Sequence, residues 1–271
     1  LITPLPRYKR LAAGAGLLSY TQITFSTHVH VGLRSGDEAM HVMSQLIPAV
    51  PIFMALSANS PFWRGHDTGH AAYRHRILAA APNYGIPTRF PDWATFDGFL
   101  NAAMRGGAIQ GFKDIHWDIR PHPDFGTLEL RAMDSVSSLH SVHAVTSLAR
   151  ALMLTLADAE AGETAELLPQ DLPHWIEREN RYRAAHLGLE ADFIINRDGD
   201  RRPLREVAAD LIELSRDTAA KHDETAGLEL ASNLLETGPD YRRQVEVYEK
   251  TNLMRAVVED LEATLIDSAK A

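Results

Sequence analysis

The sequence TFSTHVHVGL, from Thr24 to Leu33, places two histidines two positions apart in a run of strand-forming residues. Successive side chains of an extended chain point to opposite faces. We therefore predict a strand over residues 20–33, with one face in the core and the other polar. The polar face would carry two imidazoles that are able to bind a metal ion or a phosphate group. The predicted faces are Phe25, Thr27, Val29 and Val31 on the core side, and Ser26, His28 and His30 on the other.

Two later segments show a similar alternation. They are IHWDIRP at residues 115–121 and TLELRAMD at residues 127–134, and the intervening PHPDFG is long enough for a hairpin-type connection. Each segment gathers its ionisable residues on one face. The predicted polar faces are His116, Asp118 and Arg120 in the first segment, and Thr127, Glu129 and Arg131 in the second, where Leu128, Leu130 and Ala132 take the opposite face.

Most of the remaining chain has helical periodicity. Asp37 is a candidate cap for a helix over residues 38–58, which Pro48 and Pro51 would kink or divide. The sequence therefore predicts an α+β fold with early strands and a helix-rich C-terminal half, in a single domain over residues 1–271. The other predicted helices cover residues 7–18 (broken at its glycines), Asp92 to Gly106-Gly107, Ser138 to about Ala161, 172–187, 203–222, 225–236 and 239–267.

Composition excludes several classes of function. The formal net charge of −9 argues against a nucleic-acid-binding surface. The absence of cysteine excludes disulfides, thiolate metal sites and cysteine nucleophiles. No uninterrupted apolar run reaches the roughly 18 residues of a membrane span. The sequence therefore favours a cytoplasmic enzyme with no membrane or nucleic-acid partner.

Three strands with ionisable faces indicate a shared site more strongly than one strand would. A lone histidine or Glu-x-Arg pair on a strand is more often a solvent-facing or salt-bridged feature. Together, carboxylate and imidazole groups are able to bind a divalent ion, while guanidinium groups bind phosphate oxygens. There is no Walker-type glycine loop, so any nucleotide would be held in another way.

The order and length of four segments resemble the type 2 glutamate–cysteine ligases, also called YbdK-like carboxylate–amine ligases. The resemblance extends from about Arg7 to about Leu265 and implies a fold of the glutamine-synthetase type. In that fold an antiparallel sheet forms the floor of the active site and helices pack behind it. The four segments are THVHVGL, PIFMALSANSPFWRGHDTGHAAYRHR, GFKDIHWDIRPHPDFGTLELRAMD and RYRAAHLGLEADFI.

The resemblance also implies roles for individual residues. His28 and Glu129 are implied as metal ligands, and His30 as a contact to the ATP phosphates. Arg131 would neutralise the transferred phosphate, and Arg120 would be a second catalytic contact to ATP or substrate. The substrate side would include the loop residues Asn59 and Ser60, and Arg74 for the α-carboxylate of an amino acid.

The implied reaction is ATP-dependent amide formation through an acyl phosphate, with Mg²⁺ or Mn²⁺ as the cofactor ion. The implied substrates are a small carboxylate, expected to be glutamate, and an amine or amino acid; the expected assembly is a homodimer. One departure from the family pattern is that no Gly-x-Glu-x-Glu strand precedes His28. We therefore expect an N-terminal segment with the first metal-binding strand to lie outside this chain.

Two alternatives remain open at this point. The chain could be a non-catalytic or altered ligand-binding relative of the same fold. It could also be a guanidino-kinase-like phosphotransferase, although such enzymes usually have a cysteine near the substrate and this chain has none.

Overall fold

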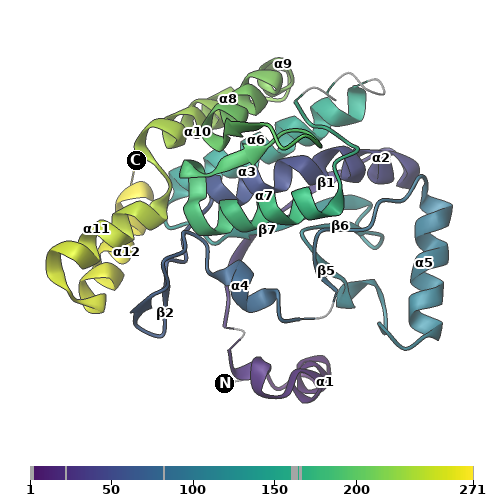
Figure 1. Cartoon of the computed structure of the whole chain (residues 1–271), viewed down its shortest axis with the longest axis horizontal. Coiled ribbons are helices and arrows are strands. Elements are labelled where there is room, and N and C mark those ends of the chain that lie inside the picture. The colour runs from purple at the N-terminus through teal and green to yellow at the C-terminus, as the bar shows by residue number, and fades with distance from the viewer. Residues whose placement is uncertain (1–2, 22, 82, 160–163, 165–166, 271) are drawn as a thin grey trace.

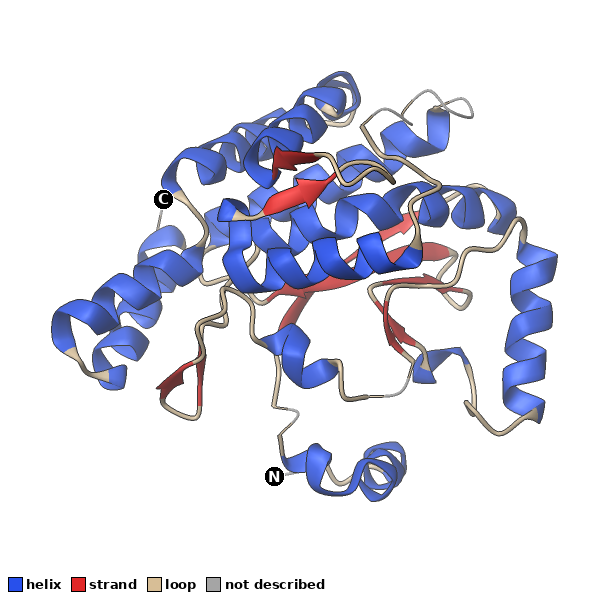
Figure 2. Ribbon diagram, in the orientation of Figure 1, coloured by secondary structure: helices blue, strands red, loops and turns tan. Residues whose placement is uncertain are grey.

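The computed structural model describes residues 3–21, 23–81, 83–159, 164 and 167–270. Helices surround a central three-stranded sheet, as Figure 1 and Figure 2 show. The sheet has the strand order β1-β7-β6 and is antiparallel throughout, so the predicted mixture of helices with an antiparallel sheet is confirmed. Its strands are β1 (Ser26–Gly32), β6 (Ile119–His122) and β7 (Thr127–Asp134).

The apolar face of this sheet lies in the core. Val29 pairs with Leu130 and Val31 with Leu128, and all four side chains are buried. This part of the face prediction is confirmed. Phe25 is an exception, because it precedes β1 and its side chain is 74% exposed. The prediction that Phe25 belongs to the core is therefore wrong.

A β-bulge interrupts the pairing of β1 with β7. Thr27 pairs with Met133 and Val29 with Leu130, so His28 alone lies opposite the two residues Arg131 and Ala132. Such a bulge moves the residues beyond it to the other face of the sheet. Asp134 consequently pairs with Ser26 on the polar face, although simple alternation would place it with Leu128 and Leu130.

Three helices cover the apolar face of the sheet, and the others form further layers. The helices α2, α3 and α6 contact the strands, α7 packs on α3, and α8, α9 and α10 pack on α6. The helices are α1 (Pro6–Ala15), α2 (Gly36–Leu46), α3 (Val50–Leu56), α4 (Arg74–Leu78), α5 (Trp93–Arg105), α6 (Leu139–Asp158), α7 (His174–Leu187), α8 (Leu204–Leu214), α9 (Arg216–Lys221), α10 (Thr225–Thr237), α11 (Asp240–Thr251) and α12 (Met254–Ser268).

Capping and proline explain several helix boundaries. Asp92 caps α5 by accepting a hydrogen bond from the Thr95 amide at 2.7 Å, as predicted. The cap of α2 is Ser35 and not the predicted Asp37, whose carboxylate instead accepts from the Trp93 amide. The two prolines divide the predicted helix at a short 3₁₀ turn, Ile47–Ala49, between α2 and α3.

The predictions missed several breaks in the chain. The predicted helix over 203–222 is divided at Ser215, and the one over 239–267 is divided where Asn252 adopts a left-handed conformation. The predicted strand over 115–121 is two short strands, β5 (His116–Trp117) and β6, with Asp118 between them. Gln22, in the predicted first strand, and the predicted helix end at Ala161 lie outside the described residues.

Three pairs of short strands complete the fold. The pair β8 with β9 was not predicted, because three-residue strands carry too little alternation to separate them from a loop. The pairs are β2 (Phe62–Trp63) with β3 (His66–Asp67), β4 (Tyr84–Gly85) with β5, and β8 (Asp192–Ile194) with β9 (Arg201–Pro203).

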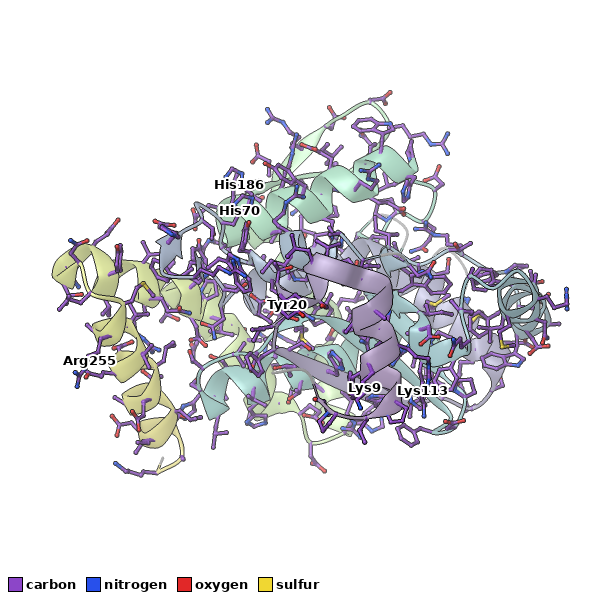
Figure 3. All side chains as sticks on the ribbon, turned by 90° about the horizontal axis from the view of Figure 1, so that it is seen from below. Lys9, Tyr20, His70, Lys113, His186 and Arg255 are labelled. Carbon is purple, nitrogen blue, oxygen red and sulfur yellow. The ribbon has the colours of Figure 1, made fainter. Side chains whose placement is uncertain are left out.

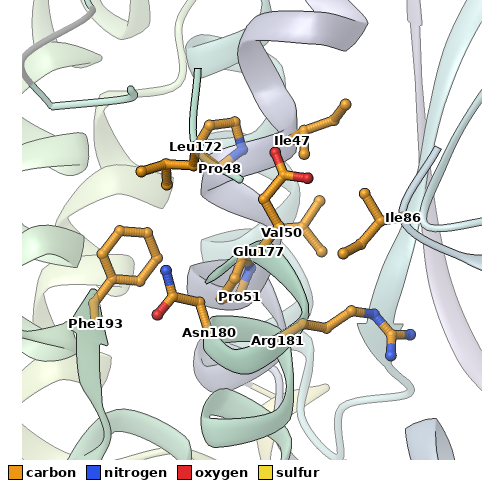
Figure 4. A pocket seen from close by; sticks show the side chains of 10 residues that line it. All are labelled: Ile47, Pro48, Val50, Pro51, Ile86, Leu172, Glu177, Asn180, Arg181 and Phe193. Carbon is orange, nitrogen blue, oxygen red and sulfur yellow. The ribbon is translucent and has the colours of Figure 1, made fainter. Parts of the chain in front are cut away.

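The interior contains one long apolar stretch and one very small cavity. Within the described part of the chain, the stretch Gly36–Leu56 alone is long and apolar enough to cross a membrane, but it is almost entirely buried in the core. The cavity, of about 10 Å³, lies beside α3 and α7 and is lined by residues such as Val50 and Phe193 (Figure 4). A space of this size holds no more than one water, so it is a packing void in the core.

Candidate functional site

Glu129 is the centre of an ionic cluster on the polar face of the sheet. His30 on β1 and Arg120 on β6 pair directly with Glu129 on β7, so the three residues form a row across the strands. Arg120 donates to Oε2 through Nη2 at 2.7 Å and Nε at 3.1 Å. Arg131, two residues further along β7, donates to Oε1 at 2.6 Å. One carboxylate is thus shared by two guanidinium groups.

Both histidines of β1 also face this carboxylate. His28 Nδ1 lies 3.0 Å and His30 Nε2 lies 3.4 Å from Glu129 Oε1. Their other ring nitrogens are held by hydroxyl groups, since His28 Nε2 is 2.8 Å from Ser26 Oγ and His30 Nδ1 is 2.9 Å from Thr127 Oγ1. The predicted polar face therefore gathers His28, His30 and Glu129 in one place.

The cations around Glu129 determine its charge. Burial alone would raise the pKa of this carboxyl, but the hydrogen bond from His28 and the charges of Arg131 and Arg120 outweigh burial and hold the pKa far below its ordinary value of 4.5. The pKa of the Arg131 guanidinium is also lowered, because burial and the neighbouring Arg120 outweigh the opposing effect of Glu129. Glu129 therefore remains ionised at neutral pH, and the cluster of two guanidinium groups and one carboxylate has a net positive charge.

A second polar cluster surrounds Asp134 at the end of β7. Its Oδ2 accepts hydrogen bonds from the Asn59 amide at 3.0 Å and from Ser60 Oγ at 2.7 Å. Arg74 Nη1 lies 3.7 Å from Oδ1, and His75 Nε2 lies 3.8 Å from the same oxygen. Asp134 thus joins the three residues predicted to bind substrate, Asn59, Ser60 and Arg74.

Several atoms of this second cluster are buried without a hydrogen bond from any described residue. They are Asp134 Oδ1, Nε and Nη1 of Arg74, and His75 Nε2. Burial raises the pKa of Asp134, although Arg74 and the hydrogen bonds from Ser60 and Asn59 oppose the shift. Buried polar atoms normally have partners, so unpaired ones point to a ligand or to water.

A third group links the sheet to α7. Arg181 on α7 donates to both oxygens of Asp118, at 2.7 and 3.0 Å, and its guanidinium lies 4.9 Å from the centre of the Tyr84 ring. Burial raises the pKa of Tyr84 to about 12. His75 Nδ1 is hydrogen-bonded to the Tyr84 hydroxyl at 2.9 Å. Burial, together with the charges of Arg74 and Arg181, holds the pKa of His75 well below 6.5. His75 is therefore a neutral imidazole.

Sequence reasoning missed two residues of these clusters, Arg181 and Asp134. Arg181 lies on a helix some sixty residues from Asp118 in the chain, and no local pattern pairs them. Asp134 was assigned no role, because the bulge that turns it toward Ser60 has no simple signature in the sequence. Asn59, Ser60 and Arg74 of the second cluster were assigned from the family resemblance alone.

Two adjoining pockets open beside these clusters. The first, of about 410 Å³, is lined by His28, Arg131 and Arg74, and by α1 residues such as Tyr8 and Leu11. Figure 3, seen from below, shows the α1 segment, which carries Lys9, in front of the middle of the molecule. The second pocket, of about 300 Å³, also contains Arg74, together with Asn59, Ser60 and Asp134. The two clusters thus face neighbouring cavities that share one arginine.

The described residues do not form a metal site built from protein ligands alone. Both oxygens of Glu129 already accept hydrogen bonds, from Arg120 and from Arg131. No group of three or more histidine, aspartate or glutamate side chains able to hold a metal is found in the described residues. His28 and Glu129 lie close enough to act as two ligands. Mg²⁺ is typically bound by one or two carboxylates together with substrate phosphates and water.

Comparison with known proteins identifies a family that this chain matches. The model of glutamate-cysteine ligase family 2 (GCS2) matches residues 1–260. The chain belongs to this family. A protein of Trichormus variabilis named "Putative glutamate--cysteine ligase 2" is 38% identical over 264 residues, covering 97% of this chain and 68% of the relative. The matched region therefore spans the part of the chain that carries all three clusters.

Other members of GCS2 have similar identity. One from Frankia alni, "Putative glutamate--cysteine ligase 2-1", is 39% identical over 90% of this chain and 63% of its own length. One from Mycobacterium tuberculosis, "Putative glutamate--cysteine ligase 2", is 36% identical over 98% of this chain and 70% of its own length. The chain thus spans about two thirds of the length of these relatives. Membership of GCS2 supports a carboxylate–amine ligase, an enzyme that forms carbon–nitrogen bonds between small molecules.

Proposed function

We propose that this protein is an ATP-dependent carboxylate–amine ligase that activates glutamate as an acyl phosphate. The observation that carries the proposal is the row of His30, Glu129 and Arg120, with His28 and Arg131 beside it, on one face of an antiparallel sheet. We include in the proposal a single catalytic domain over residues 1–271 with a fold of the glutamine-synthetase type. We also propose that the protein acts as a homodimer. Measurement of its molecular mass in solution tests this assembly.

Arg131 is the residue best placed to meet the transferred phosphoryl group. Its side chain is 18% exposed and lines the 410 Å³ pocket, and its guanidinium is already oriented by Glu129. Preorganised donors stabilise charge that develops as the phosphoryl group moves. His30 faces the same side of the sheet and would contact the ATP phosphates through Nε2.

Arg120 has a different environment, which suggests how it acts. It is buried and donates to Glu129 and to the carbonyl oxygens of Lys113 and Ile115. We propose that Arg120 mainly fixes Glu129, which in turn orients Arg131. Its predicted direct contact with ATP or substrate remains a prediction.

ATP would enter with Mg²⁺ or Mn²⁺, and the ion would neutralise phosphate charge. His28 and Glu129 would contact it from the sheet. On the carboxylate side, Arg74 would bind the α-carboxylate of glutamate, since two of its nitrogens, Nε and Nη1, make no hydrogen bond to a described residue. Asn59 and Ser60 hold the loop in place through Asp134 and would complete the substrate side.

The proposal is tested by incubating the chain with ATP, Mg²⁺, glutamate and hydroxylamine. Hydroxylamine is a small nucleophile that captures an acyl phosphate as a hydroxamate. We expect ADP and hydroxamate in equal amounts, and neither without glutamate. ADP release with a phosphorylated guanidino acceptor would support the phosphotransferase instead, and ATP binding with no ADP release would support the non-catalytic relative.

A further inference from the structure

We propose that the 300 Å³ pocket binds the acceptor amine, and that this amine is a primary ammonium compound with an aromatic or branched apolar group. The inference rests on the proposed function and names its second substrate. It depends on three features of the pocket: its position, its walls and one unpaired carboxylate oxygen.

The position of the pocket suits a second substrate. Arg74, Ile23 and Thr24 line both this pocket and the neighbouring one that contains His28 and Arg131. The two cavities therefore meet at Arg74. A glutamate held by that arginine would have its activated carboxylate on one side and an amine arriving from the other.

Four of the residues that line the pocket are aromatic, Phe25, Phe62, Trp63 and Tyr73. The Trp63 and Tyr73 rings lie 6.5 Å apart, centre to centre, and Phe62 is fixed in place by edge contact with Tyr248 at 5.1 Å. Phe25 and Ile23 also line the cavity, although they are 74% and 63% exposed. Exposed apolar side chains gathered around one cavity indicate a ligand with an apolar surface.

Asp134 supplies the polar end of the pocket. The residue is 2% exposed, and its Oδ1 accepts no hydrogen bond from the residues that the structure describes. Oδ2, by contrast, is fully used by Asn59 and Ser60. Arg74 Nη1 and His75 Nε2 lie 3.7 and 3.8 Å from Oδ1, beyond hydrogen-bond distance. An ammonium group donates three hydrogen bonds and would supply the donor that Oδ1 lacks.

Cysteine matches this pocket poorly. Its side chain is one methylene and one thiol, which would contact few of the aromatic walls. An amine with an aromatic ring or a branched alkyl chain would cover Trp63, Tyr73 and Phe25 while its nitrogen reached Asp134. The pocket thus favours such amines over cysteine.

The test compares 2-phenylethylamine, 3-methylbutylamine, cysteine and hydroxylamine as acceptors with ATP, Mg²⁺ and glutamate. We expect both apolar amines to have higher kcat/KM than cysteine. In Trp63→Ala, the ratio of kcat/KM for 2-phenylethylamine to that for hydroxylamine should fall by about ten-fold or more, since an apolar pocket discriminates by that order. Trp175→Ala, which changes an exposed tryptophan on α7 outside this pocket, is the matched control.

A binding measurement separates failure of this inference from failure of the proposed function. Calorimetric titration of 2-phenylethylamine without ATP should show binding to the unaltered chain, weakened by Trp63→Ala and by Asp134→Asn. Absence of binding, or preference for cysteine with an unchanged ratio in Trp63→Ala, would overturn the inference. Loss of hydroxamate formation alone would overturn only the ligase reaction.

Discussion

His30 and Glu129 lie directly opposite each other on β1 and β7, with His30 Nε2 3.4 Å from Glu129 Oε1. Cross-strand partners have their side chains on the same face of a sheet. The position of one histidine in THVHVGL is thereby coupled to the position of the glutamate in TLELR, a hundred residues later. The site depends on this register as much as on the residues.

Replacing Glu129 with glutamine should abolish turnover. The change keeps size but leaves Arg120 and Arg131 without their shared anion, and removing one partner of a buried ion pair costs about 3 kcal/mol or more. We expect hydroxamate formation to fall to background and the melting temperature to fall. Glu249→Gln, at an exposed position on α11, is the matched control. Normal turnover and Mg²⁺ dependence in Glu129→Gln would remove this residue from the site.

Arg131→Lys should not behave as a conservative change. Lysine keeps the charge but loses the planar fork that meets Glu129 and a phosphoryl group together. We expect kcat to fall by about 10²-fold with little change in melting temperature. Arg255→Lys, far from the sheet on α12 (Figure 3), should retain full kcat. If the two variants have equal kcat, Arg131 takes no part in phosphoryl transfer.

The free energy of unfolding should depend on pH, because the ionised form of Glu129 stabilises the fold. Its pKa in the folded protein lies below the ordinary 4.5, so its ionisation stabilises the fold fully above about pH 4.5 and less as the pH falls further. The raised pKa of Asp134 acts in the opposite direction, which makes the comparison with Glu129→Gln necessary.

Denaturant unfolding from pH 7 to pH 3 measures this contribution. The stability difference between the unaltered chain and Glu129→Gln should be largest at neutral pH and should shrink as the pH falls. A difference that stays constant over that range would mean that Glu129 has the same pKa in the folded and unfolded chain.

The three central residues of β1 should separate function from stability. His28→Ala should weaken the dependence of turnover on Mg²⁺, and His30→Ala should raise the KM for ATP. Both imidazoles are about one third exposed, so neither change should lower the melting temperature much. Val29→Ala leaves a core cavity and should cost about 1–3 kcal/mol with turnover retained. The reverse pattern would mean that the faces of β1 are assigned the wrong way round.

The elements around the Glu129 cluster could be predicted from the sequence because strand alternation is local. His28, His30, Glu129 and Arg131 needed only a period of two and the correct assumption that their strands pair. The third group, which pairs Arg181 with Asp118, could not be predicted in this way. Arg181 reaches Asp118 only because α7 packs against α3 beside the sheet, and that packing is a tertiary result with no local pattern.

Helix boundaries were predicted at a capping aspartate and at two prolines, and they were missed at a serine and at an asparagine. Asp92 and the two prolines of the first long helix gave correct breaks. The breaks at Ser215 and Asn252 were missed, because serine is common within helices and asparagine reveals a left-handed turn only in context. Phe25 was predicted to be buried on alternation alone, and its exposure became intelligible only with the neighbouring pocket.

Because of the bulge in β7, odd-numbered residues lie on the polar face in the first part of the strand and an even-numbered residue lies on it at the end. The odd-numbered Arg131 lines the first pocket, whereas the even-numbered Asp134 lines the second. Deleting Ala132 would remove the bulge but would keep Met133 opposite Thr27 and Asp134 opposite Ser26, so both side chains would keep their faces. One extra residue therefore allows the even-numbered Asp134 to share the polar face of the sheet with the odd-numbered Glu129 and Arg131.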